Sequence, residues 1–159
     1  MLNEPVHFIG IGGAGMSAIA RILLDRGIQV SGSDAKDSIV IASLRAMGAT
    51  VEIGHHASNI LSAKTVVTST AIKNSNPELK AALQSGIPVL SRAESLSELM
   101  KGYRSVAVAG THGKTTTSTI LSHLLYENNI SFTSFIGGIS ENYNSNYIEK
   151  GQDIILVEA

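Results

Sequence analysis

The sequence predicts an α/β protein, in which a parallel sheet has helices on both faces and the start of a second α/β unit follows. Three observations favour this class: short apolar runs alternate with helical patterns, glycine-rich segments follow two of the runs, and the alternation restarts after residues 101–103. Parallel strands need crossover connections, and helices usually supply them. We therefore expect two units, residues 1–101 and 102–159.

The first unit is expected to alternate strand and helix along its whole length. Gly27 ends the first helix, Ser38 caps the second, and Pro77 stands in the first turn of the third. The inward face of the first helix is expected to hold Ile19, Ile22 and Leu23. The expected strands are residues 6–9, 28–32, 50–53, 64–69 and 88–90, and the expected helices end near residues 27, 47, 84 and 100.

The second unit repeats the pattern over a shorter length. A strand is expected over residues 104–109, a tight loop over 110–113 and a helix over 114–128. The apolar residues of that helix are expected to face inward, namely Ile120, Leu121, Leu124 and Leu125. The glycine-, asparagine- and serine-rich stretch 137–147 is expected to be a loop, and 153–158 a last strand.

Composition excludes several classes of protein. Of 159 residues, 43% are hydrophobic, which is enough for a packed core and excludes general disorder. The net charge is −1, so no basic surface for nucleic acid is expected. There is no cysteine, hence no disulfide framework or thiolate site. The apolar run 8–20 lacks a basic leader and ends at Arg21, so we expect no signal peptide, no membrane span and a cytoplasmic location.

Residues Gly10–Gly15 form a G-x-G-x-x-G motif between a predicted strand and a predicted helix. The first glycine permits a turn with positive φ, the second lets backbone N–H groups approach a pyrophosphate, and the third allows close packing of helix on strand. Asp34 ends the next strand, where an acceptor for a ribose hydroxyl is expected. The motif predicts a nucleotide diphosphate, either a dinucleotide such as NAD or a UDP-sugar.

Residues Gly110–Thr116 contain the G-K-[ST] core of a P-loop, again between a strand and a helix. In such loops the lysine reaches the terminal phosphates and the following hydroxyl binds Mg²⁺. Val108 stands where the full motif has its first glycine. Glu158, at the end of the last strand, stands where P-loop enzymes carry a second acid on the metal side.

Two phosphate loops on one chain indicate two phosphorylated ligands. A dehydrogenase needs only the first loop and a simple ATPase only the second. The favoured hypothesis is therefore an enzyme that uses the energy of a nucleoside triphosphate in a reaction of a nucleotide-activated substrate. Two alternatives stay open, an NAD(P)-binding oxidoreductase domain and a non-catalytic nucleotide-binding module.

The sequence resembles the ATP-dependent Mur ligases of peptidoglycan synthesis. The glycine loop in the form GIGGAGM resembles the member that adds L-alanine, and the peptide-recycling murein ligase is the nearest alternative. Residues 128–150 depart from the pattern. The stretches that carry the resemblance are HFIGIGGAGMSAIA (7–20), VSGSD (30–34), TSTAI (68–72), NPEL (76–79), IPVLSRAESLSELM (87–100), AVAGTHGKTTT (107–117) and ILVEA (155–159).

The resemblance implies a Rossmann-like domain that binds UDP-N-acetylmuramic acid, followed by the beginning of an incomplete ATP-binding P-loop domain. It implies ATP and Mg²⁺ as cofactors and L-alanine as the second substrate, with no nucleic-acid partner; the oligomeric state stays open. The UDP-substrate residues it implies are Gly12, Gly13, Ala14, Gly15, Met16, Asp34, Ser69, Thr70 and Arg92. The ATP-binding residues it implies are Gly110, Thr111, His112, Gly113, Lys114, Thr115 and Thr116.

The resemblance also implies individual roles. Lys114 would neutralise the ATP β- and γ-phosphates, Thr115 and Glu158 would bind Mg²⁺, and His112 would lie near the γ-phosphate and the muramic acid carboxylate. His55 and His56 are adjacent in sequence and are expected to be loop surface. The residues after 103 provide few strands to bury the P-loop helix. We therefore expect that this chain binds the UDP-substrate but does not catalyse ligation by itself, and that its last part is ordered only when supported.

Overall fold

The computed structural model describes residues 2–140, 142–143 and 145–158. The chain divides into two compact units, Met1–Leu99 and Met100–Ala159, and each is described by itself.

The first unit contains a five-stranded parallel sheet, which confirms the predicted fold class. Its strand order is β3-β2-β1-β4-β5, so the order reverses between β1 and β4. Ligands of such sheets bind beyond the carboxyl ends of the strands at this reversal. The strands are β1 (Val6–Ile9), β2 (Val30–Asp34), β3 (Thr50–Ile53), β4 (Thr65–Thr68) and β5 (Val89–Ser91).

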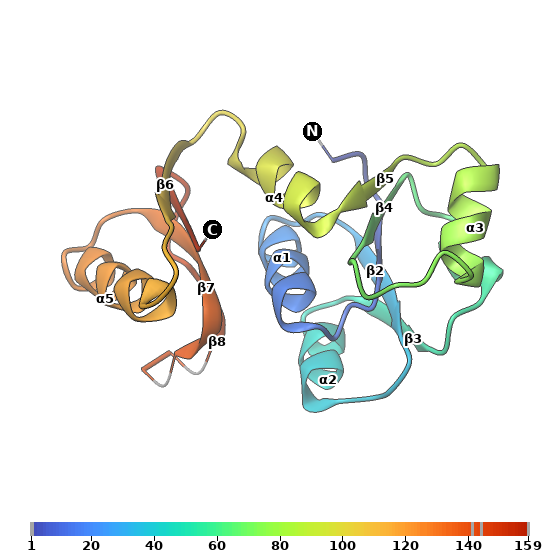
Figure 1. Cartoon of the computed structure of the whole chain (residues 1–159), viewed down its shortest axis with the longest axis horizontal. Coiled ribbons are helices and arrows are strands. Elements are labelled where there is room, and N and C mark those ends of the chain that lie inside the picture. The colour runs from blue at the N-terminus through green and yellow to red at the C-terminus, as the bar shows by residue number, and fades with distance from the viewer. Residues whose placement is uncertain (1, 141, 144, 159) are drawn as a thin grey trace. The chain divides into compact units, whose positions relative to one another are not determined.

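Helices cover both faces of this sheet, with α1 and α2 on one side and α3 on the other (Figure 1). Ile19, Ile22 and Leu23 of α1 are buried, as predicted. On the α3 side, Ile9 and Val66 of the sheet pack with residues of α3 and of the short 3-10 helix η1. The helices are α1 (Ala14–Asp25), α2 (Ile39–Ala46), η1 (Ala57–Ile60), α3 (Pro77–Gln84) and α4 (Arg92–Met100).

The end of α1 explains why β2 begins later than predicted. Gly27 adopts a positive φ of 75°, its N–H donates to the Leu24 carbonyl, and the Ile28 N–H donates back to the Leu23 carbonyl. This is the Schellman arrangement, which uses the N–H of Ile28 for the helix end. The strand expected at 28–32 therefore starts at Val30 and extends to Asp34.

The second unit has a four-stranded sheet of order β6-β9-β7-β8. β6, β9 and β7 are parallel, and β8 is antiparallel to β7. The loop predicted over 137–147 is wrong: β7 extends to Ser140 and β8 begins at Ser145. Antiparallel pairing of β7 with β8, which sets Ser140 opposite Ser145, overrides the glycine-rich composition of this stretch. The elements are β6 (Arg104–Val108), α5 (Lys114–Glu127), β7 (Phe132–Ser140), β8 (Ser145–Glu149) and β9 (Ile154–Glu158).

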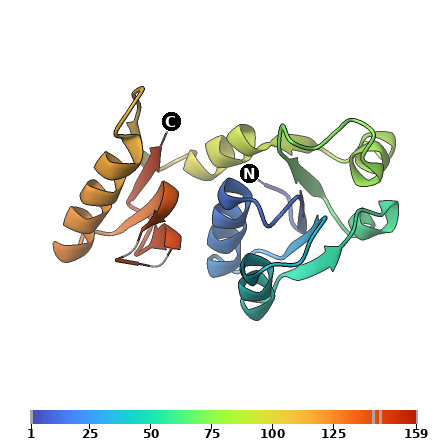
Figure 2. The ribbon, with the colours of Figure 1, turned by 60° about the horizontal axis from the view of Figure 1, so that its bottom comes forward.

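Helix α5 runs along one face of this sheet in both ribbon views (Figures 1 and 2). Its inward face is polar and small: Ser118 and Ser122 are fully buried, and the Ser122 hydroxyl lies 2.7 Å from that of Ser134 on β7. Ile120 and Leu124 are 57% and 54% exposed, so the prediction that they face inward is wrong. Leu125 does pack against the core formed by Phe132, Ile136 and Ile148.

None of the helices in the described part of the chain is long and apolar enough to cross a membrane.

Candidate functional site

The glycine loop lies between β1 and α1, at the reversal point of the sheet. Gly10 has a φ of 80°, which confirms the predicted turn. The N–H groups of Gly10 and Ile11 both donate to the main-chain carbonyl of Ser33, at 2.8 and 3.0 Å. Gly13 caps α1 and has no side chain, and the first turn of α1 carries no acidic residue. A helix start of this kind is suited to an anion.

Two polar side chains lie against the glycines of this loop. The Asp34 carboxylate accepts a hydrogen bond from the Gly12 N–H at 2.9 Å, and a Cβ built on Gly12 would meet the same oxygen at 2.9 Å. A Cβ on Gly15 would meet the Arg92 guanidinium at 2.6 Å. The predicted reason for Gly15, close packing of helix on strand, is therefore wrong, because the space is taken by Arg92 of α4.

A cavity of about 620 Å³ opens over the loop. It brings together the predicted residues Gly12–Met16, Asp34, Ser69 and Arg92, whereas Thr70 is exposed and lies outside the described lining. Lys36 and Arg92 give the lining two positive charges, and Asp34 and Asp37 give it two carboxylates. The lining residues that sequence reasoning missed are Lys36, Asp37, Ser38, Ala71 and Ile72. Lys36 and Asp37 lie two and three residues after Asp34 in the sequence, and this proximity is the signal that could have found them.

The second loop lies between β6 and α5. Gly113 has a φ of 73° and caps α5, as expected for a P-loop start. The Lys114 ammonium donates to the Gly110 carbonyl at 2.8 Å, so the side chain folds back over the loop. His112 is exposed, and its Nδ1 lies 3.2 Å from the Thr111 hydroxyl. Thr116 is exposed in the first turn of the helix.

Glu158 lies beside this loop because of strand register. β6 and β9 are parallel with Val108 opposite Glu158, so the end of β9 meets the beginning of the loop. The Thr115 hydroxyl donates to Glu158 Oε1 at 2.9 Å, and the Gly137 N–H donates to Oε2 at 2.8 Å. The structure thus brings together Thr115 and Glu158, which the sequence had paired. It adds Gly137 of β7, which lies in the stretch that was expected to be a loop.

The chemistry of Thr115 and Glu158 fits Mg²⁺. Both offer oxygen atoms and both are accessible at the loop, and Mg²⁺ is usually bound through one or two carboxylates together with substrate phosphates and waters. Within the described residues there is no group of three or more histidine, aspartate or glutamate side chains that would hold a metal by protein ligands alone. A metal at this site would therefore share its coordination with a phosphorylated substrate.

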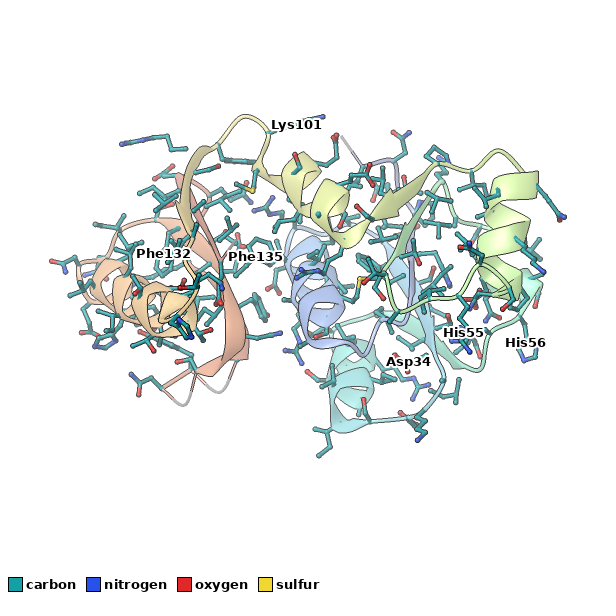
Figure 3. The ribbon with its side chains drawn as sticks, viewed as in Figure 1. Asp34, His55, His56, Lys101, Phe132 and Phe135 are labelled. Carbon is teal, nitrogen blue, oxygen red and sulfur yellow. The ribbon has the colours of Figure 1, made fainter. Side chains whose placement is uncertain are left out.

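The two adjacent histidines after β3 differ in environment (Figure 3). His56 is exposed, as predicted. His55 is only 22% exposed, and its Nδ1 lies 2.9 Å from the Ser33 hydroxyl and 3.2 Å from Glu78 Oε2, so the expectation of loop surface is wrong for it. Burial raises the pKa of the Glu78 carboxyl group, but interactions with His7, Ser33 and Asn59 outweigh burial and hold that pKa at about 2.

Comparisons with known proteins agree with this architecture. The chain is 50% identical over 155 residues to the UDP-N-acetylmuramate–L-alanine ligase of Bradyrhizobium sp. (strain ORS 278), which covers 98% of this chain and 33% of the relative. It is 51% identical over 159 residues to the ligase of the same name from Streptomyces coelicolor, covering 99% of this chain and 34% of the relative. The chain thus spans about a third of the length of these curated relatives.

Solved structures of two ligases superpose on nearly the whole of this chain. The UDP-N-acetylmuramate–alanine ligase of Thermotoga maritima superposes with a TM-score of 0.87 at 32% identity, over 96% of this chain and 36% of that one. The UDP-N-acetylmuramate:L-alanyl-γ-D-glutamyl-meso-diaminopimelate ligase of Neisseria meningitides superposes with a TM-score of 0.87 at 31% identity, over 97% of this chain and 52% of that one.

The family model described as "Mur ligase family, catalytic domain" matches residues 5–104, which include the glycine loop, Asp34 and Arg92. This match covers more than half of the chain, and the relatives and solved structures extend the likeness through the second loop. The chain belongs to the Mur ligase family.

Proposed function

We propose that this chain carries the UDP-substrate site and the ATP site of a ligase that joins L-alanine to UDP-N-acetylmuramic acid. The observation that carries the proposal is the presence of two phosphate loops, each with its own acidic partner: Gly12 with Asp34, and Thr115 with Glu158. The names of the relatives at about 50% identity support the same activity.

In the first unit, the glycine loop would hold the diphosphate of UDP-N-acetylmuramic acid. The N-terminus of α1 and the cation of Arg92 would balance its negative charge, because helix starts and guanidinium groups both favour phosphate oxygens. Asp34, Ser69 and Thr70 would contact the uridine or the sugar. The cavity of about 620 Å³ beside the loop is within the range of sites for such ligands.

In the second unit, Lys114 would leave the Gly110 carbonyl and neutralise the β- and γ-phosphates of ATP. Thr115 and Glu158 would hold Mg²⁺, which supplies positive charge to the phosphate oxygens when it is bound. His112 would lie near the γ-phosphate and the muramic acid carboxylate. Its imidazole, exposed at the tip of the loop, is able to donate a hydrogen bond there.

The reaction has two steps. The lactyl carboxylate of the muramic acid attacks the γ-phosphorus of ATP, which forms an acyl phosphate and releases ADP. The amine of L-alanine then attacks the acyl carbon, phosphate leaves, and the amine loses a proton as the amide bond forms. The residues of this chain serve the first step by positioning and by neutralising charge, which is the main requirement of phosphoryl transfer.

The alternatives have less support. An NAD(P)-binding oxidoreductase would have no use for the second loop, and the relatives at about 50% identity bear the name of an enzyme rather than of a non-catalytic module. The peptide-recycling ligase shares the fold, but the curated relatives at about 50% identity bear the name of the alanine-adding enzyme. A cytoplasmic location is part of this proposal, consistent with a sequence that has no cysteine for a disulfide framework.

The test is a thermal melt of this chain with UDP-N-acetylmuramic acid and, separately, with NADH. A ligand that binds only the native state raises the midpoint by mass action. We expect UDP-N-acetylmuramic acid to raise the midpoint and NADH to leave it unchanged. A midpoint raised by NADH alone would contradict the proposal and favour the oxidoreductase.

A further inference from the structure

The segment Asn76-Pro77-Glu78-Leu79 begins α3, and the proposed function assigns it no role. The Asn76 side chain accepts hydrogen bonds from the N–H groups of Glu78 and Leu79 at 2.9 and 3.1 Å, and Pro77 occupies the first turn. These contacts fix the start of the helix. They also fix the direction of the Glu78 side chain, which is fully buried.

The Glu78 carboxylate is contacted by residues of two strands, one 3-10 helix and one loop of the first unit. Its Oε2 accepts from the Ser33 hydroxyl of β2 at 2.6 Å and lies 3.2 Å from His55 Nδ1, in the connection after β3. Its Oε1 accepts from the Asn59 amide of η1 at 2.5 Å. His7 of β1 places its Nε2 at 3.9 Å from Oε2. His7 and His55 are thus the titratable groups that face this carboxylate.

Ser33 links this cluster to the glycine loop. Its hydroxyl donates to Glu78, while its main-chain carbonyl accepts the N–H groups of Gly10 and Ile11. The next residue, Asp34, accepts the N–H of Gly12. The N–H groups of the first three loop residues are therefore held by hydrogen bonds to two consecutive residues at the end of β2. Glu78 holds the first of these two through its side-chain hydroxyl.

A carboxylate suits this position better than an amide would. Ser33, His55 and Asn59 all present donors to Glu78, and an ionised carboxylate accepts at both oxygens. A glutamine would place an NH₂ group against one of these donors. Glu78 and Ser33 are themselves fully buried, so we expect the repulsion to be relieved by movement of Ser33 or of its neighbours.

We propose that Glu78 is a positioning residue for the nucleotide diphosphate: through Ser33 it fixes the amides of Gly10 and Ile11, and with them the loop that receives the phosphates. This inference rests on the proposed function of that loop. Glu78 makes no contact with the ligand, so its removal changes how well the loop is arranged rather than which groups line the site. A role in fold stability alone would lower the melting temperature and leave the affinity of the folded protein intact.

The test compares Glu78→Gln, Ser33→Ala and the double variant with the parent chain. Calorimetric titration with UDP-N-acetylmuramic acid is carried out at a temperature where circular dichroism shows each variant folded. We expect each single variant to bind about tenfold more weakly, and the double variant to lose little more than either, since both act through one contact. Affinity for ATP should be unchanged.

Glu52→Gln is the matched control. Glu52 is exposed on β3 and pairs in register with Ser33, so this variant removes a nearby carboxylate without touching the buried cluster. It should bind like the parent. The spectroscopic readout is the backbone amide resonances of Gly10 and Ile11 in the ligand-free chain. These should shift in Glu78→Gln and Ser33→Ala and stay in place in Glu52→Gln.

Folded Glu78→Gln that binds like the parent, or losses that multiply to a hundredfold in the double variant, would overturn the proposal. If Glu78→Gln does not fold, Ser33→Ala decides alone: tenfold weaker binding with shifted loop amides supports the role, and parental binding overturns it. If the parent itself does not bind UDP-N-acetylmuramic acid, the proposed function fails. The amide shifts then still decide whether Glu78 controls the loop.

Discussion

The Thr115 hydroxyl donates a hydrogen bond to the Glu158 carboxylate, with 2.9 Å between Oγ1 and Oε1, although 43 residues separate them in sequence. The contact joins the first turn of α5 to the end of β9. It follows from the parallel pairing of β6 with β9, which sets Glu158 beside the loop. The same carboxylate is held from the other side by the N–H of Gly137. The proposed metal site therefore depends on three separate elements.

Gly137→Ala should weaken the binding of Mg²⁺-ATP by about tenfold, or about 1.4 kcal/mol. A Cβ at residue 137 would overlap the Glu158 carboxylate, with its Cδ only 2.6 Å away, so the carboxylate would have to leave its place beside Thr115. Gly138→Ala is the matched control, because a Cβ there would meet Thr115 Cγ2 at an ordinary 3.5 Å. Calorimetry with Mg²⁺-ATP measures both.

Equal affinity in the two alanine variants, whether parental or reduced, would contradict the role given to Gly137. A loss of affinity confined to Gly137→Ala would support it. When a chelator removes Mg²⁺, this variant and the parent should bind ATP equally, because the effect is expected to act through the metal.

The Glu78 cluster predicts acid sensitivity of the first unit. The folded-state pKa of Glu78 is about 2, below its ordinary value of 4.5. A carboxyl group whose pKa is lowered by folding stabilises the native state above pH 4.5, and this contribution is lost as the pH falls toward 2. The difference corresponds to about 3 kcal/mol at neutral pH. Thermal melts at pH 5, 4 and 3 should show a steeper loss of stability in the parent than in Glu78→Gln.

Parallel slopes of melting temperature against pH in the two proteins would count against this cluster as a source of acid sensitivity. Circular dichroism reports the whole chain, but tyrosine fluorescence separates the units. The chain has four tyrosines and no tryptophan, and all four tyrosines lie after residue 99. A change seen by dichroism and absent from the fluorescence therefore belongs to the first unit.

The packing of α5 against the sheet of the second unit gives a prediction about stability. Phe132→Ala should lower the free energy of unfolding of the second unit by about 3–5 kcal/mol, because Phe132 is fully buried in its core. Leu124→Ala should change it by less than about 0.5 kcal/mol, because Leu124 is 54% exposed. Urea unfolding followed by tyrosine fluorescence compares them. Similar losses in both variants would mean that α5 buries Leu124 after all.

Local signals were sufficient for much of the first unit. β1, β3 and α3 have the predicted bounds, and the Ser38 hydroxyl caps α2 by accepting from the Ile41 N–H at 3.3 Å. These elements are set by nearby turn, cap and alternation signals. β2 begins later than predicted because the Ile28 N–H donates to the end of α1. Residue types alone do not specify this hydrogen bond.

The features that were missed depend on contacts between distant residues. Gly15 makes room for Arg92 of α4, and His55 turns inward to a glutamate of α3. Gly137, in a glycine-rich stretch, extends β7 and donates its N–H to Glu158 at the end of β9. In each case the sequence around the residue permits several environments, and a partner far along the chain selects one. The Thr115–Glu158 pair was predictable because P-loops place such an acid at a known strand end.

At the first loop, Gly12→Val should reduce affinity for UDP-N-acetylmuramic acid far more than Asp34→Ala. The valine Cβ would stand 2.9 Å from the Asp34 carboxylate and block the approach of a phosphate to the backbone. Asp34→Ala should cost only about 1–3 kcal/mol, the range expected for losing one ribose hydrogen bond. Binding by Gly12→Val at parental strength in calorimetry would show that this loop does not receive the diphosphate.

The central claim is that two separate loops bind two different phosphorylated ligands, and calorimetry of Lys114→Ala with each ligand tests it most directly. Lys114 lies in the second unit, where its ammonium is within reach of the loop carbonyl of Gly110. Lys80→Ala, at an exposed lysine of α3, is the control for loss of a positive charge. We predict that Lys114→Ala loses measurable binding of Mg²⁺-ATP and keeps the parental affinity for UDP-N-acetylmuramic acid. Comparable losses for both ligands, or none for ATP, would contradict the account.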